Sequence, residues 1–164
     1  MVRIIMHGCN GHMRQVISQL VKEDEDAQIV AGIDIADTKD NGYPVFTDLE
    51  KCDVEADAII DFSTAAAVDG ILDFSVKRKI PIVLCTTGLS KEQLAKVEEA
   101  SAQTAVLKSA NMSMGINLLM KLLKDAAQVL APAGFDMEIV ERHHKLKVDA
   151  PSGTALALAD SLNE

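Results

Sequence analysis

Two adjacent histidines, His143 and His144, are the side chains of this sequence best suited to move a proton near neutral pH. Lys147 follows closely, and residues 151–154 (Pro-Ser-Gly-Thr) then indicate a loop that enters a helix. A helix N-terminus has unpaired N–H groups and a partial positive charge, so it can hold an anion. The chain as a whole has a net charge of −9, which makes this basic run stand apart. We expect it to bind a small carboxylate and to deliver a proton to it, the alternative being a solvated loop before an ordinary capped helix.

Alternating strands and helices must position this run. The hydrophobic pattern predicts strands at residues 3–6, 28–32, 43–46, 58–62, 80–84 and 105–108. It predicts helices after the strands at 3–6, 58–62 and 80–84, a loop over residues 36–42, and a further helix over residues 116–130. This alternation predicts an α/β fold with a doubly wound, Rossmann-like parallel sheet. Residues 135–142 alternate as one more strand, which would begin an α+β substrate domain. We therefore expect a dinucleotide-binding domain over residues 1–130 and a partial substrate-binding domain over residues 131–164.

A glycine turn follows the first predicted strand, in the sequence Gly8-Cys9-Asn10-Gly11-His12-Met13. Gly8 and Gly11 supply only part of the dinucleotide fingerprint, so a plain tight turn between strand and helix is the alternative. Asp34 ends the second strand, where such folds place the carboxylate that accepts hydrogen bonds from the adenosine ribose. Asp34 would repel a 2′-phosphate and Ile35 supplies no positive charge, so we expect NADH to be preferred over NADPH, with His12 as a partial substitute for an arginine.

Polar residues end the later strands too. Asp61-Phe62-Ser63-Thr64 follows the 58–62 strand, although Ser63 and Thr64 are explained equally well as caps of the next helix. Cys85-Thr86-Thr87-Gly88 and the run from Ser109 to Ser113 follow the next two strands. Open α/β sheets bind ligands at these carboxyl ends, so we expect the polar groups to face a ligand there.

Composition narrows the class of protein. The acidic balance argues against nucleic-acid or anionic-membrane binding. Three separated cysteines favour neither a disulfide framework nor a zinc site, and we expect no metal. The N-terminus has no signal-peptide pattern, which favours a cytoplasmic location.

The run from Glu141 to Ala155 resembles the signature of the dihydrodipicolinate (4-hydroxy-tetrahydrodipicolinate) reductase family, E-x-H-H-x-x-K-x-D-A-P-S-G-T-A. The resemblance extends to the glycine turn and to the segments at 61–64, 85–88 and 109–115. It implies NAD(P)H-dependent reduction of a small cyclic dicarboxylate in lysine and diaminopimelate biosynthesis, by a homotetramer. It also implies His143 as general acid with Lys147 assisting, and His144, Gly153 and Thr154 as substrate ligands. The cofactor residues that it implies are Gly8, Cys9, Asn10, Gly11, His12, Met13, Asp34, Cys85, Thr86, Thr87, Ser109, Ala110, Asn111 and Met112.

The sequence departs from the family pattern at Arg14 and Cys85, where glycine is usual, and at Met112, where phenylalanine is usual. The family also continues beyond the point where this chain ends, so we expect a C-terminal truncation. Two alternatives to a working reductase follow. One is an inactive or partial nucleotide-binding module with a binding or assembly role. The other is a dehydrogenase acting on an aspartate-derived semialdehyde, which the full signature disfavours.

Overall fold

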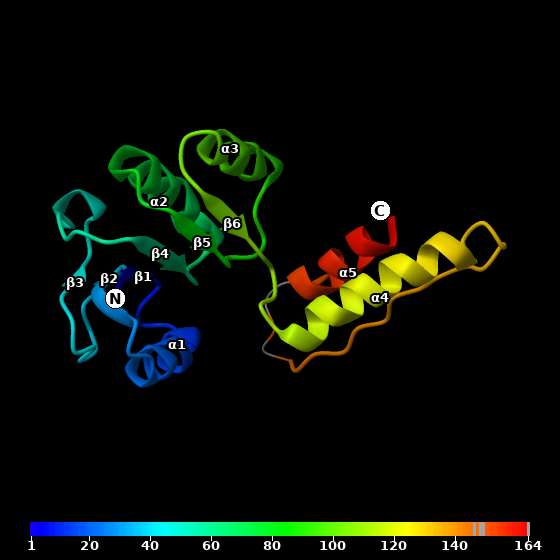
Figure 1. Cartoon of the computed structure of the whole chain (residues 1–164), viewed down its shortest axis with the longest axis horizontal. Helices are drawn as coiled ribbons and strands as arrows, with labels where there is room; N and C mark the ends of the chain where they lie inside the picture. Colours follow the sequence, from blue (N-terminus) through cyan, green and yellow to red (C-terminus); the bar gives the residue numbers. More distant parts are fainter. Residues whose placement is uncertain (146, 148–149, 164) are drawn as a thin grey trace. The chain divides into compact units, whose positions relative to one another are not determined.

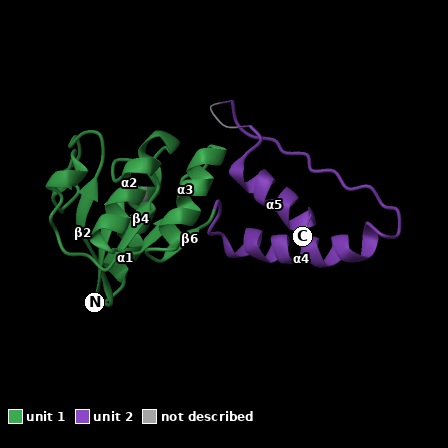
Figure 2. Cartoon of the chain, turned by 90° about the horizontal axis from the view of Figure 1, so that it is seen from above, with its two compact units in different colours: residues 1–109 green, residues 110–164 purple. Residues whose placement is uncertain are grey.

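The computed structural model describes residues 1–145, 147 and 150–163, except the side chain of Arg14. They form two compact units, Met1–Ser109 and Ala110–Glu164 (Figure 2). The structural division precedes the 130/131 boundary expected from the sequence, because the long helix before residue 131 packs within the second unit. The functional division, with residues 1–130 binding the dinucleotide and 131–164 the substrate, stays a prediction.

The first unit is built on a six-stranded sheet in which all pairs are parallel, with the order β3-β2-β1-β4-β5-β6. Helix α1 lies on one face, and α2 and α3 lie on the other (Figure 1). The predicted doubly wound α/β class is therefore confirmed. The elements are β1 Val2–His7, α1 His12–Glu23, β2 Ala27–Ile33, β3 Val45–Phe46, the 3-10 turn η1 Leu49–Lys51, β4 Ala58–Asp61, α2 Ala65–Arg78, β5 Ile82–Leu84, α3 Lys91–Ser101 and β6 Val106–Lys108.

The core of this unit lies between the sheet and the α2–α3 layer. Ile5, Ile59 and Ile82 face it from three neighbouring strands and are at most 1% exposed. The α2 side chains Ile71 and Leu72 are buried in the same cluster and complete the core on its helical side. Strands buried by this layer read as continuous runs of branched aliphatic residues, which is why the pattern located them from the sequence.

Two helix starts for which the sequence supplies capping residues differ in their hydrogen bonds. The Ser90 hydroxyl accepts a hydrogen bond from the Gln93 N–H, and the Gln93 side chain returns one to the Ser90 N–H, forming a capping box for α3. Thr64 occupies the N-cap position of α2 but makes no capping bond with its side chain. The capping alternative for Thr64 therefore lacks the hydrogen bond that would support it.

The second unit contains α4 (Met114–Leu130) packed against α5 (Gly153–Asn163). The strand predicted over residues 135–142 is wrong, since this run has no regular secondary structure. Its alternating pattern is real, but a strand forms only when a neighbour pairs with its N–H and C=O groups. The described residues of this unit provide no such neighbour. Within the same described part of the chain, no helix is both long and apolar enough to cross a bilayer.

Candidate active site

A cleft of about 960 Å³ opens at the carboxyl ends of β1, β2 and β4 in the first unit. It is lined by the predicted residues Gly8, Asn10, Gly11 and Asp34, together with residues of η1 and α2. This size lies in the range of cofactor and small-molecule sites. The structure thus brings the glycine turn and the acid at the end of β2 to one cavity.

Gly8 is required by the geometry of the turn. Its φ is +76°, a left-handed conformation that other residues rarely adopt. A Cβ atom at this position would lie 2.5 Å from the backbone oxygen of Phe62. Gly11 immediately precedes α1, and its N–H closes the turn onto the Gly8 carbonyl at 3.0 Å. The absence of a side chain at Gly8 therefore lets the turn lie against the backbone that follows β4, beside the cleft.

Asp34 is tied to this turn. One carboxylate oxygen accepts the Asn10 N–H at 2.7 Å and the other accepts the Ile35 N–H at 2.8 Å. The Asn10 side chain donates to the Ala36 carbonyl at 2.6 Å, and Lys39 donates to the Asn10 carbonyl. A carboxylate has about four acceptor positions, so Asp34 keeps capacity for a ribose hydroxyl.

The other residues predicted from the glycine turn differ in exposure. Cys9 is fully buried, its N–H donates to the Ile33 carbonyl at 3.5 Å, and it does not line the cleft. His12 and Met13 open α1 and are exposed. Their role in binding stays a prediction.

A buried polar network at the ends of β1, β4 and β5 was missed as a unit by the sequence reasoning. His7 Nδ1 lies 2.6 Å from one carboxylate oxygen of Asp61, and the Thr86 hydroxyl donates to the other at 2.6 Å. The Ser63 N–H adds a third contact to Asp61, at 3.3 Å. His7 and Asp61 end neighbouring strands and are register partners, which is the signal that could have linked them.

This network sets the charge of Asp61. Burial alone would raise the pKa of Asp61, but hydrogen bonds from His7, Ser63 and Thr86 outweigh it and hold the pKa below its usual value. The neighbouring Cys85 is also buried, and burial together with the Asp61 charge raises the pKa of its thiol to about 11. Cys85 is consequently a neutral thiol at neutral pH and is unsuited to act as a nucleophile.

The segments after β5 and β6 complete the first unit. Thr86 is buried with its hydroxyl committed to Asp61, whereas Thr87 is exposed. The Ser109 N–H donates to the Leu84 carbonyl at 3.1 Å, which anchors the residue beside β5. Of Cys85, Thr86 and Thr87, Thr87 alone is exposed, and its role in binding a ligand stays a prediction.

Asp61 gives the fold a defined acid sensitivity. Its folded pKa lies below the unfolded value of about 3.9, so its stabilisation is present above that pH and is lost as the pH falls through the folded pKa. We expect Asp61→Asn to destabilise the first unit at pH 7 by roughly 2–4 kcal/mol, because the groups that contact the buried carboxylate lose their charged hydrogen-bond acceptor. Thermal unfolding between pH 7 and 3 should show that the difference in stability between the parent chain and Asp61→Asn narrows below about pH 4. As a control, Glu25→Gln changes an exposed acid and should unfold like the parent chain at every pH. A stability difference between Asp61→Asn and the parent chain that does not change with pH would contradict the prediction.

In the second unit, the signature residues converge on the start of α5. The Glu141 carboxylate accepts the Ser152 N–H at 2.9 Å, and the Ser152 hydroxyl accepts the Ala155 N–H at 3.0 Å as an N-terminal cap. Hydrogen bonding by Ser152 lowers the pKa of Glu141, so it is a carboxylate at neutral pH. Its second oxygen lies 3.4 Å from His143 Nδ1, an ion-pair distance without a hydrogen bond. The predicted entry from a loop into a helix is confirmed. Through Ser152, this helix start holds Glu141, which lies beside His143.

The remaining predicted residues of this unit lie around the same turn. Asn111 donates from its side chain to the Thr154 hydroxyl at 2.9 Å, which links the segment before α4 to α5. His144 is exposed, and its carbonyl accepts the Lys147 N–H at 3.1 Å. Gly153 is the first residue of α5, while Ala110 and Met112 flank Asn111. The signature positions Leu146, Val148 and Asp149 lie outside the described residues, as does the side chain of Arg14.

Comparison with known proteins decides the family. Residues 2–112 match the family described as dihydrodipicolinate reductase, N-terminus, and residues 115–164 match its C-terminus. The chain belongs to the dihydrodipicolinate reductase family. The resemblance found from the signature is thereby confirmed over nearly the whole chain.

Relatives of this family match the full length of the chain but extend beyond it. The 4-hydroxy-tetrahydrodipicolinate reductase of Caldanaerobacter subterraneus subsp. tengcongensis is 51% identical over 164 residues, which are all of this chain and 64% of that protein. The dipicolinate-bound dihydrodipicolinate reductase from Paenisporosarcina sp. TG-14 is 30% identical, with a TM-score of 0.75 over 99% of this chain and 65% of that one. The chain thus spans just under two thirds of the length of these relatives.

More distant structures share the fold alone. The WlbA dehydrogenase from Bordetella pertussis, solved in complex with NADH and UDP-GlcNAcA, is 17% identical with a TM-score of 0.58 over 77% of this chain and 42% of that one. This agrees with a Rossmann-like sheet in the first unit.

Proposed function

We propose that this chain carries the cofactor site and the proton-transfer site of an NAD(P)H-dependent 4-hydroxy-tetrahydrodipicolinate reductase. The observation that carries the proposal is the arrangement at the start of α5, where one turn holds Glu141 through Ser152 and Glu141 lies beside His143. Membership of the family and the dipicolinate bound to a relative of 30% identity support a small cyclic dicarboxylate as the substrate.

The first unit fits a dinucleotide. Gly8 and Gly11 line the cleft without side chains, and the N–H groups at the start of α1 can hold a pyrophosphate. The Asp34 carboxylate would accept hydrogen bonds from the ribose hydroxyls. When bound, the nicotinamide supplies a hydride to the substrate. Thr87, Ser109, Ala110, Asn111 and Met112 are proposed to orient the nicotinamide half.

The second unit supplies charge and a proton. His143 would give its proton to the substrate carbon after hydride transfer, with Glu141 orienting the imidazole through Nδ1 and leaving Nε2 for the substrate. His144, Lys147, Gly153 and Thr154 would bind the two carboxylates, because a helix N-terminus, an ammonium group and a hydroxyl are all donors. Asn111 fixes the Thr154 hydroxyl in place for this contact.

Turnover tests the proposal directly. NADH binding by the 164-residue chain is measured by calorimetry, and NADH absorbance is then followed in the same preparation after dihydrodipicolinate is added. We expect binding and a substrate-dependent loss of NADH. Binding without turnover would favour the alternative of a partial nucleotide-binding module, and absence of binding would refute Gly8, Gly11 and Asp34 as a cofactor site.

The preference for NADH is proposed on the charge of Asp34. Asp34→Asn removes a negative charge from the place where a 2′-phosphate would sit, so the ratio of NADPH to NADH dissociation constants should fall by about tenfold. Fluorescence titration with each cofactor measures this ratio. Asp37→Asn is the matched control, because Asp37 is an exposed acid nearby that does not line the cleft. Equal ratios in the parent chain and in Asp34→Asn would contradict the assignment.

A homotetrameric assembly and a cytoplasmic location are proposed from the family resemblance and the sequence pattern. Size-exclusion chromatography with light scattering tests the assembly of this chain directly.

A further inference from the structure

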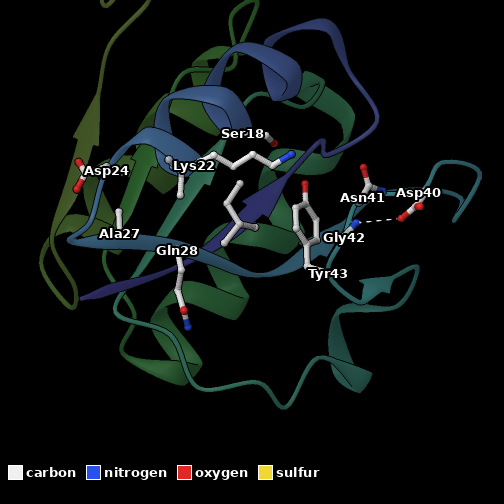
Figure 3. A pocket seen from close by; sticks show the side chains of 11 residues that line it. Ser18, Lys22, Asp24, Ala27, Gln28, Asp40, Asn41, Gly42 and Tyr43 are labelled. Carbon is white, nitrogen blue, oxygen red and sulfur yellow. Dashed lines mark hydrogen bonds between the residues drawn. The ribbon is translucent and has the colours of Figure 1, made fainter.

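The first unit has a second cavity, of about 540 Å³, between the C-terminal half of α1, the start of β2 and the loop from Asp40 to Tyr43 (Figure 3). Ser18, Asn41 and Tyr43 line it, but the unpaired polar atom of each side chain is buried away from the open space. Asp24 and Asn41 lie on opposite sides of the cavity in Figure 3. The polar groups of this cavity therefore do not converge on one ligand, and the connected polar groups lie in the second unit.

In the second unit, side-chain amides connect the start of α4 to the start of α5. Asn117 Nδ2 donates to the Asn111 carbonyl at 3.0 Å and to the Ser113 carbonyl at 2.8 Å. The Asn111 side chain accepts the Ser113 N–H at 2.8 Å through Oδ1 and donates to the Thr154 hydroxyl at 2.9 Å through Nδ2. These contacts lead from Asn117 through Asn111 to Thr154.

The Ser113 N–H decides which way the Asn111 amide points. An N–H can only donate, so the amide atom that receives it is the oxygen, and the other end of the amide is the NH₂ group. Because an NH₂ group only donates, the Thr154 oxygen accepts in its contact with Asn111. Within the described part of the chain, no acceptor receives the hydroxyl proton of Thr154. Thr154 is therefore left as a hydrogen-bond donor.

Asn117 holds the segment on which this polarity depends. Ser113 occupies the N-cap position of α4 but makes no capping bond with its side chain. The Ser113 carbonyl also accepts the Asn117 N–H at 3.0 Å, as in any helical turn. The bond from Asn117 Nδ2 to the Asn111 carbonyl is the one that ties Asn111 to the first turn of α4 through a side chain.

We propose that Asn117 is a positioning residue of the substrate site: by holding Asn111, it keeps the Thr154 hydroxyl directed as a donor to a carboxylate of the substrate. The inference rests on the proposed reductase function, in which Thr154 is one of the carboxylate ligands. An ionised carboxylate only accepts hydrogen bonds, so a hydroxyl that binds it must donate. Asn117 lies outside the signature run and was not among the predicted site residues.

The rotamer of Thr154 tests this chain of contacts without a ligand. A threonine in a helix commonly divides between two χ1 rotamers, so the contact with Asn111 should hold one of them. Three-bond couplings to the Thr154 methyl carbon in the 164-residue chain should give a single rotamer, and Asn117→Ala should shift them toward the average of two. Asn117→Asp should do the same, because a carboxylate of the same size has no N–H to donate.

Asn163→Ala is the matched control. Asn163 donates to a carbonyl four residues earlier, that of Ala159, at 3.0 Å, as Asn117 does to Ser113. Its contact lies at the other end of α5 from Thr154. Its loss should leave the Thr154 couplings unchanged.

Binding of dipicolinate, a small cyclic dicarboxylate, tests the substrate contact. Calorimetry should show about tenfold weaker binding by Thr154→Val, which keeps the shape of the side chain and removes the hydroxyl, and about three- to tenfold weaker binding by Asn117→Ala. The double variant should bind like Thr154→Val alone, within about twofold, because Asn117 acts through that hydroxyl. Asn163→Ala should bind like the parent chain.

Three results would overturn the inference. Losses that add in the double variant, or an unchanged affinity in Asn117→Ala, would do so while leaving the proposed function in place, since the parent chain binds dipicolinate in both cases. Thr154 couplings that are the same in the parent chain and in both Asn117 variants would show that Asn117 does not hold Thr154. A parent chain that does not bind dipicolinate would instead refute the dicarboxylate site of the proposed function, and with it the substrate role of Asn117, whatever the couplings show.

Discussion

Replacing His143 with glutamine is expected to lower kcat for reduction of dihydrodipicolinate by about 10²- to 10⁴-fold, the usual contribution of a positioned general acid. Glutamine keeps a polar side chain of similar length beside Glu141 but cannot give up a proton near neutral pH. NADH affinity should stay within about twofold, because the glycine turn and Asp34 belong to the other compact unit and the lost step is proton transfer. Stopped-flow absorbance of NADH measures kcat, and calorimetry measures the binding.

Lys145→Gln is the matched control for this experiment. Lys145 is an exposed residue two positions after His143, and it is not among the residues proposed to bind substrate or to transfer a proton. We expect its kcat to equal that of the parent chain. A His143→Gln chain that keeps full turnover would remove His143 from the proton-transfer role and would point to Lys147 or to water as the proton source.

The parts of the fold that follow from local pattern could be predicted from the sequence. Apolar strands such as 58–62 and the capped helix beginning after Ser90 carry their signals within a few residues, because burial and capping act locally. The start of α5 is of the same kind, since Ser152 supplies the cap that its sequence position suggests. Of these elements, α5 also carries predicted chemistry, since Gly153 and Thr154 are its first residues.

Features that depend on contacts distant in sequence were not predicted. Residues 135–142 have the alternation of a strand, but pairing needs a neighbour, and alternation carries no information about one. The His7–Asp61–Thr86 network joins three strand ends, so no single motif displays it. The cavity beside Tyr43 likewise arises where α1, β2 and a loop meet, and none of its residues forms a motif.

Gly8→Ala is expected to have the largest effect on the first unit. At a φ of +76°, any side chain costs roughly 1–2 kcal/mol, and the new Cβ would lie 2.5 Å from the Phe62 oxygen. The clashing atom belongs to the backbone at the end of β4, so relief requires moving the turn or that strand end. We expect a total loss of about 3 kcal/mol or more, a fall in melting temperature of at least roughly 6–12 °C and at least tenfold weaker NADH binding.

Gly42→Ala separates the two causes. Gly42 has a similar φ of +72°, but a Cβ there would meet nothing within 4 Å. Its substitution should therefore cost only the conformational part, about 1–2 kcal/mol, and should leave the glycine turn in place. Denaturant unfolding of the parent chain and both variants gives the difference, which measures the clash with Phe62. Equal losses for Gly8→Ala and Gly42→Ala would show that close approach of the backbone does not constrain this turn, and the reason for glycine at the cofactor cleft would then be the left-handed conformation alone.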